Sequence, residues 1–219
     1  MTAHEFVEKL VAEMQAVFSR LAEGQTLEAE SQGQVAVVPL LRAALKSELE
    51  AAELGGLALP VTPEIDAKSA FAQQCADEMK HYRLIVARLA ELGETVVDGE
   101  VLAEGYSPLY QYVNGLKSTV ERIAAGPFAR EAIAEVRNVQ FIDFCERVGD
   151  RETARLYRDT IQPEEIEHHR LGRAVLERLC VDEETQRLAS EATRSTLAIA
   201  DELSTLAERS TGIGPIPVS

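Results

Sequence analysis

The stretch DEMKHYR, residues 77–83, places a glutamate three residues before a histidine in a chain with only four histidines. A second stretch, EEIEHHR at residues 164–170, repeats this arrangement with Glu165 and His168. On an α-helix, residues i and i+3 lie on the same face. Each pair would therefore direct one carboxylate and one imidazole the same way. Two such pairs that meet inside a helical bundle would supply four ligands for metal ions.

Both stretches fall within segments whose apolar residues recur at helical spacing, and strand patterns are essentially absent. The sequence therefore predicts an all-α fold. We expect Gly55-Gly56 to end one helix, with the alternative that this helix continues past the glycines, and Pro127 to lie in the first turn of another. The expected helices cover residues 4–22, 35–54, 64–92, 127–148, 151–180 and 182–209, with a shorter helix that begins at Ser107-Pro108.

The spacing of these helices predicts one domain over residues 1–210, followed by a flexible tail at 211–219. Two helix hairpins, residues 35–92 and 127–180, would be joined by a long crossover at 93–126. Within the second hairpin, Pro163 removes a backbone donor and should bend the helix just before the second motif.

The net charge and composition of the chain disfavour nucleic acids and membranes as partners. The formal charge is −15 at pH 7 and the sequence pI is about 4.7, which disfavours binding to a nucleic-acid backbone. No apolar run is long enough to span a bilayer, and charged residues interrupt the N-terminal segment where a signal peptide would be apolar. Three isolated cysteines show no paired spacing. We expect a cytoplasmic protein with reduced thiols, no membrane contact and no nucleic-acid partner.

The helix before each motif also carries a glutamate on its apolar stripe. Glu48 and Glu135 each precede the glutamate of their motif, Glu78 or Glu165, by 30 residues. A buried carboxylate is costly unless a cation compensates its charge. The predicted ligands are therefore Glu48, Glu78, His81, Glu135, Glu165 and His168, with Glu50, Glu53 and Glu131 as alternatives in the two leading helices.

This ligand pattern resembles the ferritin-like di-iron carboxylate superfamily, in which a four-helix bundle with a long crossover holds two metal ions. The stretch 77–81 is also similar to the D-E-x-R-H motif of bacterial multicomponent monooxygenases, with Lys80 in place of arginine. The resemblance implies that Asp77 orients His168 and that Glu164 orients His81. A metal-bound imidazole needs an acceptor for its other N–H group.

The resemblance implies two iron ions as cofactor, although a Mn/Fe pair or other divalent metals would use the same oxygen and nitrogen donors. We expect an enzyme that activates O₂, an oxygenase or oxidase acting on a small apolar or acyl-type substrate. An electron-donor protein would be a further partner, and the chain would be a monomer or a homodimer. One alternative is a ferroxidase, iron-storage or peroxide-scavenging protein. The other alternative is a metal-free helical module that binds a partner.

Four other residues near the motifs have simpler explanations than a role in the chemistry. His169 follows a predicted ligand by one position, so it should point away from the metals, toward the rim of the bundle. Tyr82 and Tyr157 could transfer protons or electrons near a metal centre, but buried amphipathic tyrosines are common. Cys75 is expected to be a small buried residue.

Overall fold

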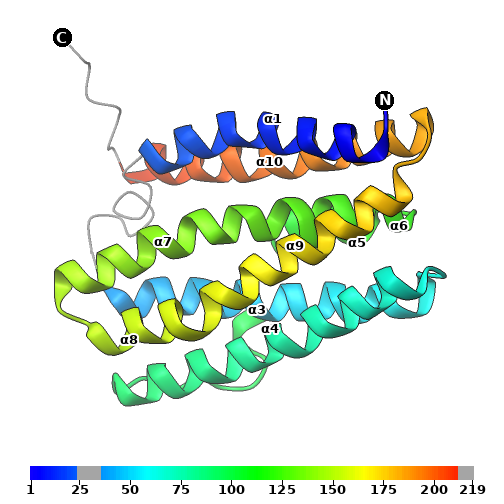
Figure 1. The fold of residues 1–219 in the computed structure, drawn as a ribbon. Helices are drawn as coiled ribbons and strands as arrows, with labels where there is room; N and C mark the ends of the chain where they lie inside the picture. The colour runs from blue at the N-terminus through cyan, green and yellow to red at the C-terminus, as the bar shows by residue number, and fades with distance from the viewer. Residues whose placement is uncertain (24–35, 212–219) are drawn as a thin grey trace, which may run out of the picture.

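The computed structural model describes residues 1–23 and 36–211, and all its regular structure in these ranges is helical (Figure 1). The predicted all-α class is therefore confirmed. The tail expected at 211–219 lies, apart from its first residue, outside the described residues. No helix within the described ranges is both long and apolar enough to cross a membrane.

Two antiparallel helix hairpins form the centre of the bundle. The first hairpin consists of two long helices joined by a short 3₁₀ segment. Its elements are α3 (Val37–Ala58), η1 (Leu59–Val61) and α4 (Ile65–Glu91). The second hairpin has two arms, each made of consecutive helical segments. These are α6 (Thr119–Ile123), η3 (Ala124–Arg130) and α7 (Glu131–Val148), then α8 (Arg151–Leu156), η4 (Tyr157–Ile161) and α9 (Gln162–Leu179).

Two further helices cover one side of this bundle. α1 (Ala3–Glu23) and α10 (Glu183–Thr211) lie side by side, on the side opposite the first hairpin (Figure 1). α1 packs on α9 and α7, and α10 packs on α6 and η3. The crossover contains η2 (Glu100–Leu102) and α5 (Pro108–Gly115), which both contact α3. The predicted bundle with additional terminal helices is therefore confirmed.

The first hairpin corrects one predicted helix boundary. We expected Gly55-Gly56 to end the helix, but α3 continues through both glycines to Ala58. A Cβ atom on Gly55 would lie 3.0 Å from the backbone oxygen of Phe71 and 3.2 Å from the Cβ of Cys75. The glycine therefore permits close approach of α3 and α4 and does not break the helix.

The second hairpin begins earlier than its sequence indicated. Ser118 and Glu121 form a capping box at the start of α6, where the Ser118 side chain accepts a hydrogen bond from the Glu121 N–H. The helical path then continues without a break through Pro127, which lies inside η3 and not in a first turn. The helix predicted at 127–148 therefore starts at 119, and the crossover ends at 118.

Both arms of the second hairpin contain a π-helical segment just before the ligand region. η3 ends at Arg130, and η4 ends at Ile161, next to Pro163 in the first turn of α9. A π turn closes i→i+5 hydrogen bonds and so takes in one residue more than an α turn. The sequence predicts a bend at Pro163. The structure has a π turn immediately before this proline.

The arms of the second hairpin touch at Gly172. A Cβ atom on this residue would lie 2.7 Å from the carbonyl carbon of Pro127 and 2.8 Å from the backbone nitrogen of Phe128. These are backbone atoms of η3, which cannot move aside as a flexible side chain could. The absence of a side chain on Gly172 is therefore required for α9 to pack on η3.

The turn of the second hairpin is formed by Gly149 and Asp150. Gly149 ends α7 with φ of 86°, a left-handed conformation that favours glycine. The Asp150 side chain caps α8 by accepting from the Thr153 N–H at 3.0 Å. Arg88 of α4 donates to both Asp150 and Thr153 at 2.9 and 2.8 Å. This arginine therefore ties the turn to the first hairpin.

Candidate metal centre

Six buried side chains from the four central helices converge at one level of the bundle. None of these residues, taken as a whole, exposes more than 7 % of its surface. α3 and α4 supply one half of the set, and α7 and α9 supply the other. They are Glu48, Glu78, His81, Glu131, Glu165 and His168. We call this set the metal cluster.

The metal cluster divides into two overlapping groups of four. Glu48 and His81 belong to the first group, and Glu131 and His168 belong to the second. Glu78 and Glu165 belong to both. Within each group, one potential ligand atom per residue lies within 4.8 Å of all the others. The arrangement therefore offers two adjacent cation positions with two shared carboxylates.

Both histidines direct the same ring nitrogen into the metal cluster. Nδ1 of His81 lies 3.3 Å from a carboxylate oxygen of Glu48 and 3.5 Å from one of Glu165. Nδ1 of His168 lies 3.2 Å from Glu165 and 3.6 Å from Glu78. As neutral imidazoles they would present Nδ1 to a metal ion.

The other nitrogen of each histidine meets the acidic residue that the resemblance indicated. Nε2 of His81 lies 2.8 Å from Glu164, and Nε2 of His168 lies 3.2 Å from Asp77. Each acid belongs to the helix opposite its histidine. A carboxylate that accepts from Nε2–H fixes the tautomer in which Nδ1 is free to bind a metal.

Lys80 links these two acids. Its ammonium group pairs with Glu164, and it lies 3.7 Å from a carboxylate oxygen of Asp77. Lys80 occupies the position of the arginine in the D-E-x-R-H motif. No role for this residue is predicted from the sequence, apart from that departure from the motif. In the structure it partly neutralises both acids that hold the histidines.

The structure does not bring the predicted ligand Glu135 into the metal cluster, where Glu131 lies instead. Glu135 lies one helical turn further along α7 and is only partly buried. Helical spacing in the sequence places Glu135 on one face with Phe128, Ala132, Val139 and Ile142. Phe128 lies within the π segment η3, and Val139 is 50 % exposed. Glu131 and Glu135 both lie in the regular helix α7, one turn apart on the same face, so periodicity alone does not decide between them.

The two hairpins do not share one spacing between the glutamates of their two arms. In the first hairpin, 10 residues separate Glu48 from the end of α3 at Ala58; in the second, 17 separate Glu131 from the end of α7 at Val148. The two turns therefore lie at different distances from the metal cluster. A spacing of 30 residues in one hairpin does not have to recur in the other.

Two side chains hold Glu131 in place. Gln74, one turn before Glu78 on α4, donates to Oε1 of Glu131 at 2.5 Å. Arg130 donates to the same oxygen at 3.0 Å and also to the backbone and side chain of Ser47 on α3. The other oxygen, Oε2, has no hydrogen-bond partner.

Burial and mutual repulsion perturb the acids of the metal cluster. Burial, followed by the charge of Glu78, raises the pKa of Glu48 well above its usual range. The pKa of Glu131 is raised in the same way by burial and then by the charge of Glu165. Burial would also raise the pKa of Glu165, but hydrogen bonds with the two histidines lower it overall.

The histidines respond in the opposite sense. Burial acts to lower the pKa of His168, yet its hydrogen bond with Glu165 and the surrounding carboxylates raise that pKa to about 9. The pKa of His81 is raised further by hydrogen bonds with Glu165, Glu48 and Glu78, against the effect of burial. Without metal, protons are therefore needed to balance the buried carboxylates.

The donor set fits a pair of divalent cations. Oε1 of Glu78 and Oε2 of Glu131 are buried without a hydrogen-bond partner, and such groups are costly in a protein interior. Both oxygens belong to the group around His168. Metal ions would satisfy these atoms and replace the protons. The buried cluster could hold a metal, and its occupation by iron stays a prediction.

A cavity of about 170 Å³ reaches the metal cluster between α3 and α7. Four carboxylates of the cluster line it, together with the ring of Tyr157. The Tyr157 hydroxyl is buried and has no hydrogen-bond partner. Burial raises its pKa well above the usual range, so it is a neutral donor. The cavity could admit a small molecule to the cations.

The alternative ligands on α3 face elsewhere. Glu50 accepts from the backbone and side chain of Ser107 at 2.7 and 2.5 Å, and it so anchors the start of α5. Glu53 accepts from the Tyr110 hydroxyl at 3.4 Å. Both residues therefore fasten the crossover to α3. Only Glu48 of this helix enters the metal cluster.

The remaining residues considered from the sequence lie outside the metal cluster. His169 is partly buried and bonds through Nδ1 to the carbonyl oxygen of Phe128 at 2.7 Å. Burial, followed by the charges of Asp98 and Glu100, raises the pKa of Tyr82. Cys75 packs against the glycines of α3.

Comparisons with protein-family models, with curated proteins and with solved structures find no match to this chain. The class of protein therefore rests on the bundle and on the geometry of the metal cluster.

Proposed function

We propose that this chain is a ferritin-like di-iron oxidoreductase that uses O₂ to oxidise a small apolar or acyl-type substrate. The observation that carries the proposal is the pair of overlapping four-residue groups with two shared carboxylates. Each group contains one histidine, and each histidine is oriented by an acid from the opposite helix. Iron bound at both positions would supply the electrons that reduce O₂.

The protein residues would perform four tasks. One iron would be held by Glu48 and His81, and the other by Glu131 and His168. Both irons would share the carboxylates of Glu78 and Glu165. Asp77 and Glu164 would keep Nδ1 of the histidines unprotonated and aimed at the metal. The four central helices would exclude bulk water from the cluster. The cavity beside Tyr157 would admit O₂ and the substrate, with the tyrosine hydroxyl as a hydrogen-bond donor.

The proposal is tested by loading the protein with Fe(II) without oxygen and then measuring O₂ uptake. We expect about two irons per chain and rapid uptake. His81→Ala and His168→Ala should each lose more than half of the bound iron and all O₂ uptake. His169→Ala, which alters the neighbouring residue on α9, is the matched control and should keep both.

Two other results would point to the alternative functions. Repeated oxidation of added iron by a large cage of subunits, seen by size-exclusion chromatography, would indicate ferroxidase or storage activity. Failure to bind Fe(II), with unchanged or increased stability in Glu78→Ala, would indicate a metal-free helical module. Equal iron content in all three histidine variants would contradict the ligand assignment.

A further inference from the structure

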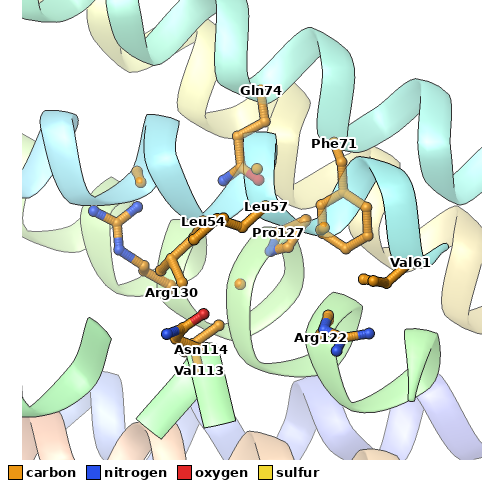
Figure 2. Close-up of a pocket in the computed structure, with 14 residues that line it drawn as sticks. Leu54, Leu57, Val61, Phe71, Gln74, Val113, Asn114, Arg122, Pro127 and Arg130 are labelled. Carbon is orange, nitrogen blue, oxygen red and sulfur yellow. The ribbon is translucent and has the colours of Figure 1, made fainter. Parts of the chain in front are cut away.

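A second cavity, of about 200 Å³, adjoins the side chains that hold Glu131. It lies among α3, α4, α5 and η3, and both Gln74 and Arg130 line it. Figure 2 shows Arg122 across the cavity from these two residues. None of the six residues of the metal cluster lines it. We call it the Arg122 cavity.

The walls of the Arg122 cavity are mainly apolar. Leu54, Phe71 and Pro127 lie around it, and its mouth is bordered by Leu57 and Val61, which are 52 % and 53 % exposed. Apolar side chains that remain exposed around a hollow are typical of a binding site. Cavities for drug-sized ligands occupy roughly 300–1,000 Å³, so a ligand here would be smaller.

Arg122 supplies a positive charge that no neighbouring acid neutralises directly. Its guanidinium donates to the backbone oxygens of Leu116 and Lys117, at 2.7 and 3.1 Å. Among the side chains that the structure describes, in residues 1–19 and 36–203, it forms no ion pair. The carboxylate of Glu121, which feels its charge, is bound by Ser118 in the capping box. A guanidinium has five N–H donors, so some remain for a ligand.

Arg130 is the other cation that lines the cavity, and unlike Arg122 it is paired with a carboxylate. It is paired with Glu131 and bonded to Ser47, so its charge is already used by the protein. An anionic group would therefore bind at Arg122. The apolar part of the same molecule would extend along Phe71 toward Gln74.

We propose that the Arg122 cavity binds a small amphipathic carboxylate, with its carboxylate on Arg122 and its apolar chain among α3, α4 and η3. Guanidinium groups pair well with carboxylates because two parallel N–H donors match the two oxygens. A cationic or uncharged molecule of the same length would lack this pairing. The inference does not depend on the proposed oxygen chemistry, because no residue of the metal cluster is part of the cavity.

Gly126 offers a way to fill the cavity without disturbing the backbone. It lines the cavity in η3, and a Cβ atom placed on it would meet no atom within 4 Å. Gly126→Leu should therefore place its side chain in the space of the ligand. Gly115 at the end of α5 is likewise open but lies outside the cavity lining. Gly115→Leu is the matched control.

The test is isothermal titration calorimetry of the full-length, metal-free protein with octanoate, octanamide and octylamine. We expect octanoate to bind once per chain and the other two to bind at least tenfold more weakly. Arg122→Gln should weaken octanoate binding about tenfold, Arg122→Lys by less, and Gly126→Leu should abolish it. Gly115→Leu, and Arg187→Gln on the exposed face of α10, should leave it unchanged.

Three results would overturn the proposal. They are absence of octanoate binding to the wild-type protein, equal affinity for octylamine, and unchanged octanoate affinity in Gly126→Leu. Circular dichroism and thermal unfolding of each variant show whether it is folded. Metal content, measured separately, should remain at the wild-type level in Arg122→Gln. If the wild-type protein bound no metal, the proposed function would be contradicted. The calorimetric result would still show whether the Arg122 cavity binds a carboxylate.

Discussion

Each half of the metal cluster presents two glutamates and one histidine, but the helices that carry them differ in backbone geometry. Glu48, Glu78 and His81 stand on α3 and α4, which are regular α-helices packed closely at Gly55. The other half, on α7 and α9, follows a π segment in each arm. π segments recur at functional sites because they change which face a helix presents. The comparison shows that similar metal chemistry does not require a repeated backbone.

The largest difference between the halves should appear when their close-packed glycines are replaced. A Cβ on Gly172 would lie 2.7 Å from backbone atoms of η3, whereas on Gly55 its closest contact would be 3.0 Å. We expect Gly172→Ala to destabilise the fold by about 3 kcal/mol and Gly55→Ala by about 1 kcal/mol. Urea denaturation measures both, with Gly56→Ala as control. Equal stability losses would mean that α9 can move away from η3.

Glutamine variants of the two candidate acids on α7 test the second half directly. Glu131→Gln removes a carboxylate of the metal cluster and should lower metal content by about half or more. Glu135→Gln changes the same chemical group one turn away and should leave metal content unchanged. Metal analysis after dialysis against Mn(II) or Fe(II) gives the answer. The reverse result would restore the ligand that α-helical spacing predicted.

The acids behind the histidines should have a smaller effect, and a different one in each half. Such partners typically change metal affinity 10–100-fold. Glu164 lies 2.8 Å from His81, and Asp77 lies 3.2 Å from His168. We expect Glu164→Ala to weaken metal binding more than Asp77→Ala, with both weaker than wild type in a competitive chelator titration. Wild-type affinity in both variants would show that the histidines need no such support.

A further effect concerns the pH dependence of stability at Glu135. Burial, followed by the charge of Glu165, raises the pKa of Glu135 to about 7. A raised pKa in an acid makes the fold less stable as pH rises from the unfolded value of about 4.5 through 7. Glu135→Gln should therefore be more stable than wild type at pH 8 by about 2 kcal/mol, allowing for partial exposure, with little difference at pH 4. Denaturation of the metal-free proteins at both pH values tests this sign.

Five of the six residues of the metal cluster could be predicted from the sequence, and the reason is chemical. A glutamate and a histidine lie on one helical face, and the pattern occurs on two helices. Burial of these polar groups costs free energy unless a cation compensates the charge, so the pattern is distinctive within an apolar stripe. Periodicity gives the face of a regular helix, and it identified Glu48 correctly in α3. The same reasoning also predicted the bundle and the terminal helices.

The rest depended on backbone features that local sequence does not show. Gly55 resembles a helix end but serves close packing, and Pro127 resembles a helix start but lies within η3. Periodicity cannot give the height of a residue along a bundle, since residues i and i+4 share a face. Glu131 and Glu135 lie in the same regular helix and differ in height alone by this criterion.

A crystal structure of the protein grown with Mn(II), with anomalous scattering measured at the manganese edge, tests the central claim most directly. We expect two anomalous peaks per chain, roughly 3.5–4 Å apart as in two-metal sites, each bound by Nδ1 of one histidine. Glu78 and Glu165 should bridge the peaks, Glu131 should bind the one nearer His168, and Glu135 should bind neither. A single peak, no peak, or a pair of peaks bound by Glu135 in place of Glu131 would contradict the account.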